Sequence, residues 1–142
     1  MLVSNEPAGE PKLVPIPARV LLVEDDVPLR DVIADEIRDQ GLDVVELTDG
    51  IELLEYFRGA ASSYLPMMPD VVVAEMDLPG CSGIEACSRL RQAGSRVPII
   101  LLSVPGLAEL HEAAREAGAA LVVDRPFSLE ALAKTVASAA RR

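Results

Sequence analysis

The most regular feature of the chain is an alternation between short apolar runs and longer stretches in which apolar residues recur every three or four positions. A short aliphatic run favours a strand, and a run without polar interruption is typical of a strand buried on both faces. The central run, at residues 71–74, is of this kind. We expect five strands, at residues 19–23, 43–47, 70–75, 97–102 and 119–123.

A stretch with helical spacing follows each of these runs. In the first, Leu29, Ile33 and Ile37 repeat at intervals of four residues. Pro28 suits the first turn of a helix, and Gly41 suits its end. The expected helices cover residues 28–41, 49–59, 84–94 and 107–117, and a last one that begins after an N-cap at Ser128. Alternating strands and helices predict an α/β fold, a doubly wound five-stranded parallel sheet with helices on both faces.

The domain organisation follows from where this alternation begins. Residues 1–17 carry four prolines and no periodic apolar pattern, so we expect a flexible N-terminal segment there. Residues 18–142 are expected to form one domain, because half of the 142 residues are apolar and a chain of this length builds one core. Only 3% of the residues are aromatic, so that core must be aliphatic.

Charge and hydropathy exclude several classes of function. A formal net charge of −10, with dispersed basic residues, argues against nucleic-acid binding because phosphates would be repelled. No apolar run approaches the roughly 18 residues that a membrane span needs. The first ten residues lack the apolar region of a signal peptide. We therefore expect a cytoplasmic protein without a membrane segment.

The cysteines and the histidine have plain interpretations. Cys81 and Cys87 are too few and too close for a disulfide framework, and we expect two reduced thiols used for packing. A redox role for Cys81, near a helix start, is the alternative. His111 is the single histidine and is expected to be solvated on a polar helix face.

Polar residues stand where four of the five strands end. They are Glu24 and Asp25, Glu75, Ser103 and Arg125. Carboxyl ends of parallel strands meet at one edge of the sheet, which is where such folds bind ligands. We expect these residues to form one site.

Four motifs in order make the chain resemble the response-regulator receiver domains of bacterial two-component signalling, from about Arg19 to the C-terminus. They are Val-Glu-Asp-Asp, Pro-Asp-Val-Val-Val-Ala-Glu-Met-Asp-Leu-Pro-Gly-Cys-Ser-Gly, Ile-Ile-Leu-Leu-Ser and Arg-Pro-Phe. The resemblance implies a flavodoxin-like strand order 2-1-3-4-5. It also implies protein partners, among them a histidine kinase or a downstream signalling protein.

The resemblance assigns roles to individual residues. Glu24 and Asp25 occupy Mg²⁺-binding positions, and the backbone carbonyl of Asp77 would assist. Glu75 stands at the phosphoacceptor position, and Ser103 is the hydroxyl that senses the phosphoryl group. Pro126 would follow a cis peptide bond.

The chain also departs from the family pattern. Glu75 replaces the phosphoacceptor Asp, and Arg125 replaces the usual Lys. Val122 stands where the family has a switching aromatic ring, and Val104-Pro105 follow the sensing hydroxyl. The family's switch, in which the ring follows the hydroxyl inward, therefore looks disabled.

The longer side chain of Glu75 changes the expected chemistry. One more methylene shifts the carboxylate by roughly 1.5 Å, and a misplacement of about 1 Å can lower a rate about 10²-fold. Arg125 can hold this carboxylate with a bidentate fork, which Lys cannot. Mg²⁺ binding is then expected to be weak, because the third carboxylate is displaced.

Three functional hypotheses follow. The first is an atypical receiver that is not an enzyme and acts by protein–protein interaction, with a homodimer through the face of the fourth helix, fifth strand and fifth helix as one form. The second is an active receiver, phosphorylated by a histidine kinase at Glu75 or at Asp77. The third is a small phosphatase of the Asp-x-Asp kind, suggested by Glu75-x-Asp77, although its nucleophile would have to be Asp.

Overall fold

The computed structural model describes residues 16–61, 68–103 and 108–141. Most of the segment expected to be flexible, residues 1–15, lies outside the described residues, as do Val104 and Pro105. The proposed boundary between an N-terminal segment and a domain at residue 18 therefore stays a prediction.

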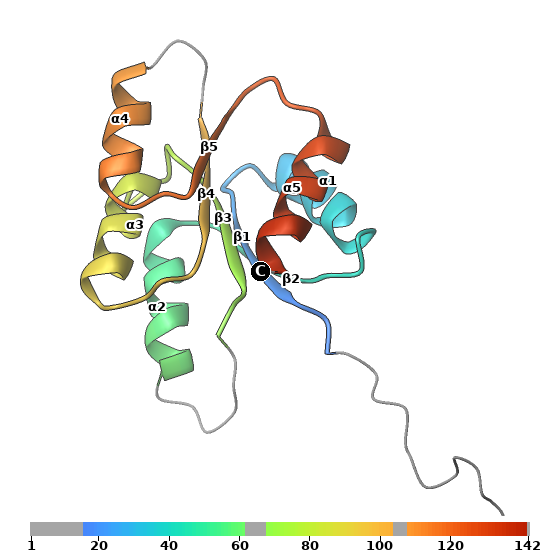
Figure 1. The fold of residues 1–142 in the computed structure, drawn as a ribbon, viewed down its shortest axis with the longest axis horizontal. Helices are drawn as coiled ribbons and strands as arrows, with labels where there is room; N and C mark the ends of the chain where they lie inside the picture. The colour runs from blue at the N-terminus through green and yellow to red at the C-terminus, as the bar shows by residue number, and fades with distance from the viewer. Residues whose placement is uncertain (1–15, 62–67, 104–107, 142) are drawn as a thin grey trace, which may run out of the picture.

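Five strands and five helices alternate along the described chain (Figure 1). The strands are β1 (Arg19–Val23), β2 (Asp43–Leu47), β3 (Val71–Glu75), β4 (Ile99–Ser103) and β5 (Leu121–Asp124). The helices are α1 (Val27–Arg38), α2 (Gly50–Ala61), α3 (Gly83–Gln92), α4 (Ala108–Glu116) and α5 (Leu129–Ala140). The expected elements are all present, with bounds that differ by a few residues.

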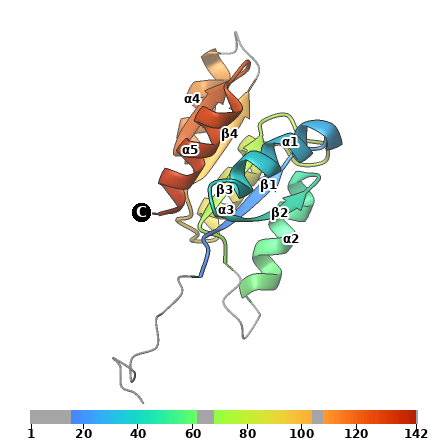
Figure 2. The same ribbon diagram turned by 90° about the vertical axis from the view of Figure 1, so that its right-hand side faces the viewer.

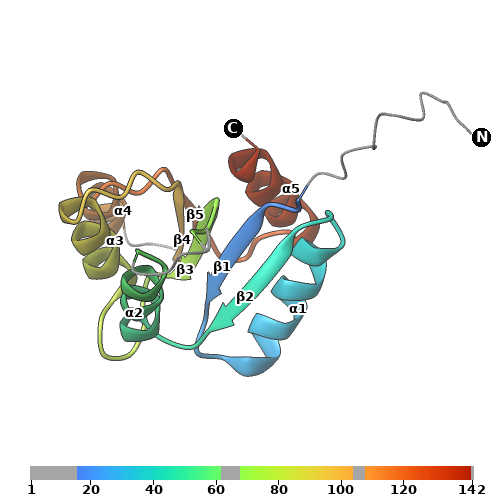
Figure 3. The ribbon, with the colours of Figure 1, turned by 90° about the horizontal axis from the view of Figure 1, so that it is seen from below.

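The strands form one parallel sheet in the order β2-β1-β3-β4-β5, which confirms the expected flavodoxin-like topology. Helices α1 and α5 cover one face, and α2, α3 and α4 cover the other (Figures 1 and 2). Figure 3 shows the sheet between these two layers. The right-handed connections of a parallel sheet produce this division.

Successive strand residues serve opposite faces of the sheet. Leu21 and Val72 pack with the α2, α3 and α4 side chains, whereas Leu22 and Val73 pack with those of α1 and α5. All residues of β3 and β4 are buried, but the edge strands β2 and β5 are only partly buried. The unbroken apolar runs of the central strands thus reflect a sheet covered on both faces.

Local signals begin and end several helices as the sequence indicates. The hydroxyl of Ser128 accepts a hydrogen bond from the amide of Ala131 and caps α5. Asp26 caps α1 through the amide of Leu29, and Pro28 lies in the first turn. Gly41 follows α1 with a φ of +82°, a conformation that favours glycine.

Among the helices that the structure describes, none has the length and hydropathy of a membrane span.

Candidate functional site

The carboxyl ends of three strands meet around one small cavity. Glu24 follows β1, Glu75 ends β3 and Arg125 follows β5. The cavity, of about 280 Å³, is lined by Glu24, Asp25, Asp26, Glu75, Asp77 and Arg125. The structure therefore brings together all the predicted strand-end residues except Ser103, places Asp77 with them, and adds Asp26.

The contact between Glu75 and Arg125 that the sequence predicts is present. Arg125 Nη2 contacts Glu75 Oε2 and also lies 3.1 Å from Glu24 Oε1. The expected bidentate fork is wrong, because one guanidinium nitrogen is shared between two carboxylates. Nε of Arg125 is buried and has no hydrogen-bond partner among the described residues.

The two carboxyl groups of this cluster are more deeply buried than the cation that they contact, and burial raises the pKa of both. The side chains of Glu24 and Glu75 are 2% and 5% exposed, whereas that of Arg125 is 33% exposed. Burial raises the pKa of Glu75 to about 8. The charge of Arg125 opposes this rise in the pKa, and Glu24 adds to it. Burial also raises the pKa of Glu24, although the Asp26 amide opposes the shift.

Two buried carboxyl groups thus face one cation. Like charges that share one buried site disfavour double ionisation, which favours retention of one proton. The pKa values of both groups are raised, and that of Glu75 reaches about 8, so Glu75 is a group that can hold a proton near neutral pH.

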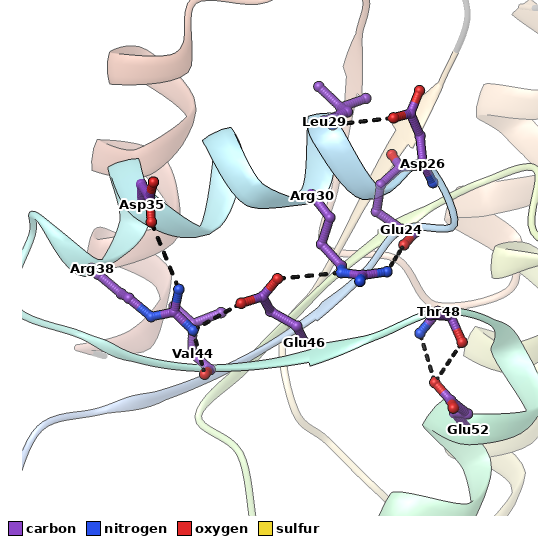
Figure 4. Close-up of polar contacts among 10 residues, drawn as sticks. All are labelled: Glu24, Asp26, Leu29, Arg30, Asp35, Arg38, Val44, Glu46, Thr48 and Glu52. Carbon is purple, nitrogen blue, oxygen red and sulfur yellow. Dashed lines mark hydrogen bonds and ion pairs between the residues drawn. The ribbon is translucent and has the colours of Figure 1, made fainter.

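An arginine on α1 holds the loop that carries Glu24 (Figure 4). Arg30 Nη1 donates to the backbone oxygen of Glu24 at 2.8 Å, and Arg30 Nε donates to Glu46 on β2 at 3.2 Å. Arg38, two turns later on α1, also bonds Glu46, at 3.0 Å. The amide of Asp26 donates to Glu24 Oε2 at 3.1 Å. We did not predict this support of the Glu24 loop from the sequence. The one sequence signal for it is the spacing of Arg30 and Arg38 on α1.

The Leu-Pro-Gly-x-x-Gly turn positions Glu75 from the other side. A Cβ on Gly83 would lie 2.4 Å from the backbone oxygen of Glu75, so only glycine lets α3 start so close to β3. Gly80 in the same turn has a φ of +78°, which also favours glycine. The turn thus fixes the end of β3 against the start of α3.

The donor set does not fit a bound Mg²⁺ as it is arranged. Glu24 and Glu75 are engaged by Arg125, and the side chains of Asp25 and Asp77 are exposed. Within residues 16–61, 68–103 and 108–141, no group of three or more His, Cys, Asp or Glu side chains is placed to hold a metal ion. A divalent cation would need Arg125 to release at least one of the two buried carboxyl groups.

Ser103 is buried at the end of β4, but its hydroxyl is engaged outside this cavity. Ser103 Oγ donates to Asp124 Oδ1 at 2.7 Å, and His111 Nε2 lies 2.6 Å from the same oxygen. The expectation that His111 is simply solvated is wrong, since its side chain is 25% exposed and contacts Asp124. No feature of the sequence signals this contact, because it depends on how α4 lies against the end of β5.

The remaining predicted positions have the following places. Val122 is partly buried and packs against the core on the α2, α3 and α4 side. The Arg125–Pro126 peptide bond is cis, as the resemblance implies. Cys81 and Cys87 are free and buried, and burial raises the pKa of both thiols, which disfavours a reactive thiolate.

Comparisons with known proteins agree with this fold. Residues 20–137 match the model of the response regulator receiver domain. The chain is 32% identical over 127 residues to the alkaline phosphatase synthesis transcriptional regulatory protein SphR of Synechococcus elongatus, covering 88% of this chain and 49% of SphR. It is 33% identical over 132 residues to the transcriptional regulatory protein PdtaR of Mycobacterium tuberculosis, covering 89% of this chain and 58% of PdtaR.

Solved structures give the same answer. The receiver domain of the Francisella response regulator 1452 matches with a TM-score of 0.78 at 25% identity, covering 88% of this chain and 98% of that domain. Full-length FixJ from B. japonicum matches with a TM-score of 0.73 at 26% identity, covering 87% of this chain and 58% of FixJ. The chain spans about half the length of the curated relatives it matches. The chain therefore belongs to the response regulator receiver domain family.

Proposed function

We propose that this receiver domain is an atypical one, which acts in two-component signalling by binding protein partners and in which Glu75 replaces the phosphoacceptor Asp. The observation that carries the proposal is the contact of the Glu75 carboxyl with Arg125 beside buried Glu24. This arrangement pairs the buried charges that line the pocket with one another.

A carboxyl group accepts a phosphoryl group only as a nucleophilic anion placed in line with the donor. The pKa of Glu75, raised to about 8, keeps much of this group protonated near neutral pH. When ionised, its Oε2 faces Arg125. Both states lower the nucleophilicity of Glu75.

The switch positions support a receiver held in one state. Val122 has no ring to move and no hydroxyl to exchange hydrogen bonds, and it is partly buried against the core. The single proton of the Ser103 hydroxyl is donated to Asp124. A partner would therefore meet a constant surface.

Further parts of the proposal concern partners, ligands and location. The partners are proteins, among them a histidine kinase or a downstream signalling protein, and one form is a homodimer through α4, β5 and α5. Mg²⁺ binds weakly, nucleic acid is not a ligand of this chain, and the role is signalling in the cytoplasm rather than catalysis. The net charge of −10 supports the exclusion of nucleic acid, and the pairing of Glu24 and Glu75 with Arg125 supports weak Mg²⁺ binding.

The decisive experiment is incubation with acetyl phosphate and Mg²⁺, followed by intact mass measurement under mild conditions. The expected result is no added phosphoryl mass. An added mass that disappears in Glu75→Gln would overturn the proposal in favour of an active receiver at Glu75, and one that disappears only in Asp77→Asn would place phosphorylation at Asp77. A receiver with an ordinary phosphoacceptor Asp, treated in parallel, verifies that the donor is active.

A further inference from the structure

A second polar cluster lies beside the carboxylate site and joins α4 to the sheet. Asp124 Oδ1 accepts a hydrogen bond from Ser103 Oγ at 2.7 Å and lies 2.6 Å from His111 Nε2. Ser103 Oγ and His111 Nε2 are 3.4 Å apart. Ser103 and Asp124 are direct partners in the β4–β5 ladder, so His111 is the member that a helix contributes.

Few distributions of protons are possible among Ser103, His111 and Asp124. An ionised Asp124 only accepts hydrogen bonds, and the Ser103 hydroxyl has a single proton to donate. The His111 contact is a hydrogen bond when Nε2 carries a proton, which holds for one neutral tautomer and for the cation. The hydrogen bonds from Ser103 and His111 lower the pKa of Asp124, which keeps it an acceptor.

Apolar packing alone attaches α4 weakly. Among the side chains of α4 that the structure describes, Ala114 is the only one buried by nine-tenths or more, and Leu110 is 36% exposed. An alanine removes little apolar area from water, so its burial stabilises the helix little. The position of α4 therefore depends strongly on its polar contact with the strand ends.

The same cluster adjoins the carboxylate site through the backbone. Arg125 follows Asp124 directly, and the Arg125 amide donates to the backbone oxygen of Ser103 at 2.9 Å. The residue that holds Glu24 and Glu75 is thus fixed to the strand ends that His111 contacts.

We propose that His111 is a positioning residue that, through Asp124, ties α4 to the ends of β4 and β5. The role of this contact in signalling rests on the proposed function. The contact extends that function, because it holds the surface of α4 in one position without an aromatic ring. The surface offered to a protein partner is then set by a hydrogen bond.

Hydrogen exchange with mass spectrometry on the full chain, without phosphodonor or divalent cation, tests the tie. In His111→Leu the side chain keeps its bulk but loses its N–H, and we expect α4 amides to exchange about tenfold faster while α1 amides are unchanged. In His111→Gln an amide N–H reaches a similar point, so protection should be kept. Glu112→Leu, the same change at the exposed neighbouring position, is the matched control and should leave α4 protected.

The proposal is overturned if His111→Leu leaves α4 exchange unchanged, if α1 and α4 speed up equally, or if Gln behaves as Leu does. The ring of His111 gives a second measurement on the unaltered protein, since it is the single histidine. Nitrogen NMR should show Nε2 protonated, and a ring protonated only at Nδ1 would also overturn the proposal. Failure of the proposed function appears instead as phosphoryl mass in the acetyl phosphate experiment, so either can fail alone.

Discussion

Arg125 Nη2 lies 3.1 Å from Glu24 Oε1, although the two residues are 101 positions apart in the sequence. The same nitrogen contacts Glu75, so a single guanidinium group bridges the ends of β1 and β3. In this site the cation is shared, and the two buried carboxyl groups compete for it.

The shared cation predicts unequal costs for its removal and for the removal of Glu75. Arg125→Ala leaves two buried carboxyl groups uncompensated, and we expect a loss of about 3 kcal/mol in the free energy of unfolding, the lower end for a buried pair because Arg125 is partly exposed. Glu75→Gln replaces a largely protonated acid with an amide and should cost less than about 1 kcal/mol at pH 7. The double variant should lose clearly less than the sum. Urea unfolding measures all three.

Arg115→Ala, on the exposed side of α4, is the control for the loss of a surface arginine. Strictly additive costs at positions 75 and 125 would show that the two side chains do not interact.

The raised pKa of Glu75 predicts the direction of a pH dependence. Between the usual pKa of 4.5 and about 8, the folded protein binds more protons at this group than the unfolded protein does. Stability from Glu75 should therefore fall as the pH rises through this window, with a slope of at most about 1.4 kcal/mol per pH unit. Glu75→Gln should flatten the slope. Urea unfolding from pH 5 to pH 9 in the presence of a chelator measures it.

Glu112→Gln removes an exposed carboxylate of α4 and should leave the slope as it is in the unaltered protein. A slope that Glu75→Gln does not change would mean that Glu75 is ionised throughout this range.

Restoring the ordinary residue pair should reopen the pocket. With Glu75→Asp and Arg125→Lys together, the carboxylate at position 75 is one methylene shorter and the planar guanidinium that bridges the two carboxyl groups is gone. The carboxyl groups at positions 24 and 75 should then become available to a divalent cation. Mg²⁺ affinity should rise at least tenfold by calorimetric titration, and slow phosphorylation by acetyl phosphate should appear.

Glu75→Asp alone is the informative comparison, because Arg125 would still hold Glu24, and its gain in Mg²⁺ affinity should be smaller. Unaltered Mg²⁺ affinity in the double variant would show that these two residues do not limit metal binding.

A constant α4–β5–α5 surface predicts where charge changes will weaken association. Glu109 and Arg115 are exposed on α4. Glu109→Lys and Arg115→Glu should each weaken self-association several-fold if the homodimer forms through this face, as measured by sedimentation velocity over a range of concentrations. Asp31→Lys, on the exposed side of α1, is the matched control. Equal dissociation constants for all variants would place the interface elsewhere.

The sequence by itself determined the order and type of the elements and the edge at which chemistry gathers. Apolar runs such as residues 71–74 have no other stable place than a sheet covered on both faces. The N-cap at Ser128 depends on one local hydrogen bond, and the local backbone conformation at position 41 favours glycine. The meeting of Glu75 with Arg125 was predictable because both lie at the carboxyl ends of strands in one parallel sheet.

The tertiary structure alone decided which atoms share a partner. Whether Arg125 forms a fork with Glu75 or divides one nitrogen between two carboxylates depends on the depth of the pocket and the path of the loop that Arg30 holds. His111 contacts Asp124 because α4 lies on the sheet with this side chain toward the end of β5, and the spacing of residues along α4 does not specify that placement. Spacing along one element cannot specify such contacts, since each depends on the relative placement of two or three elements distant in sequence.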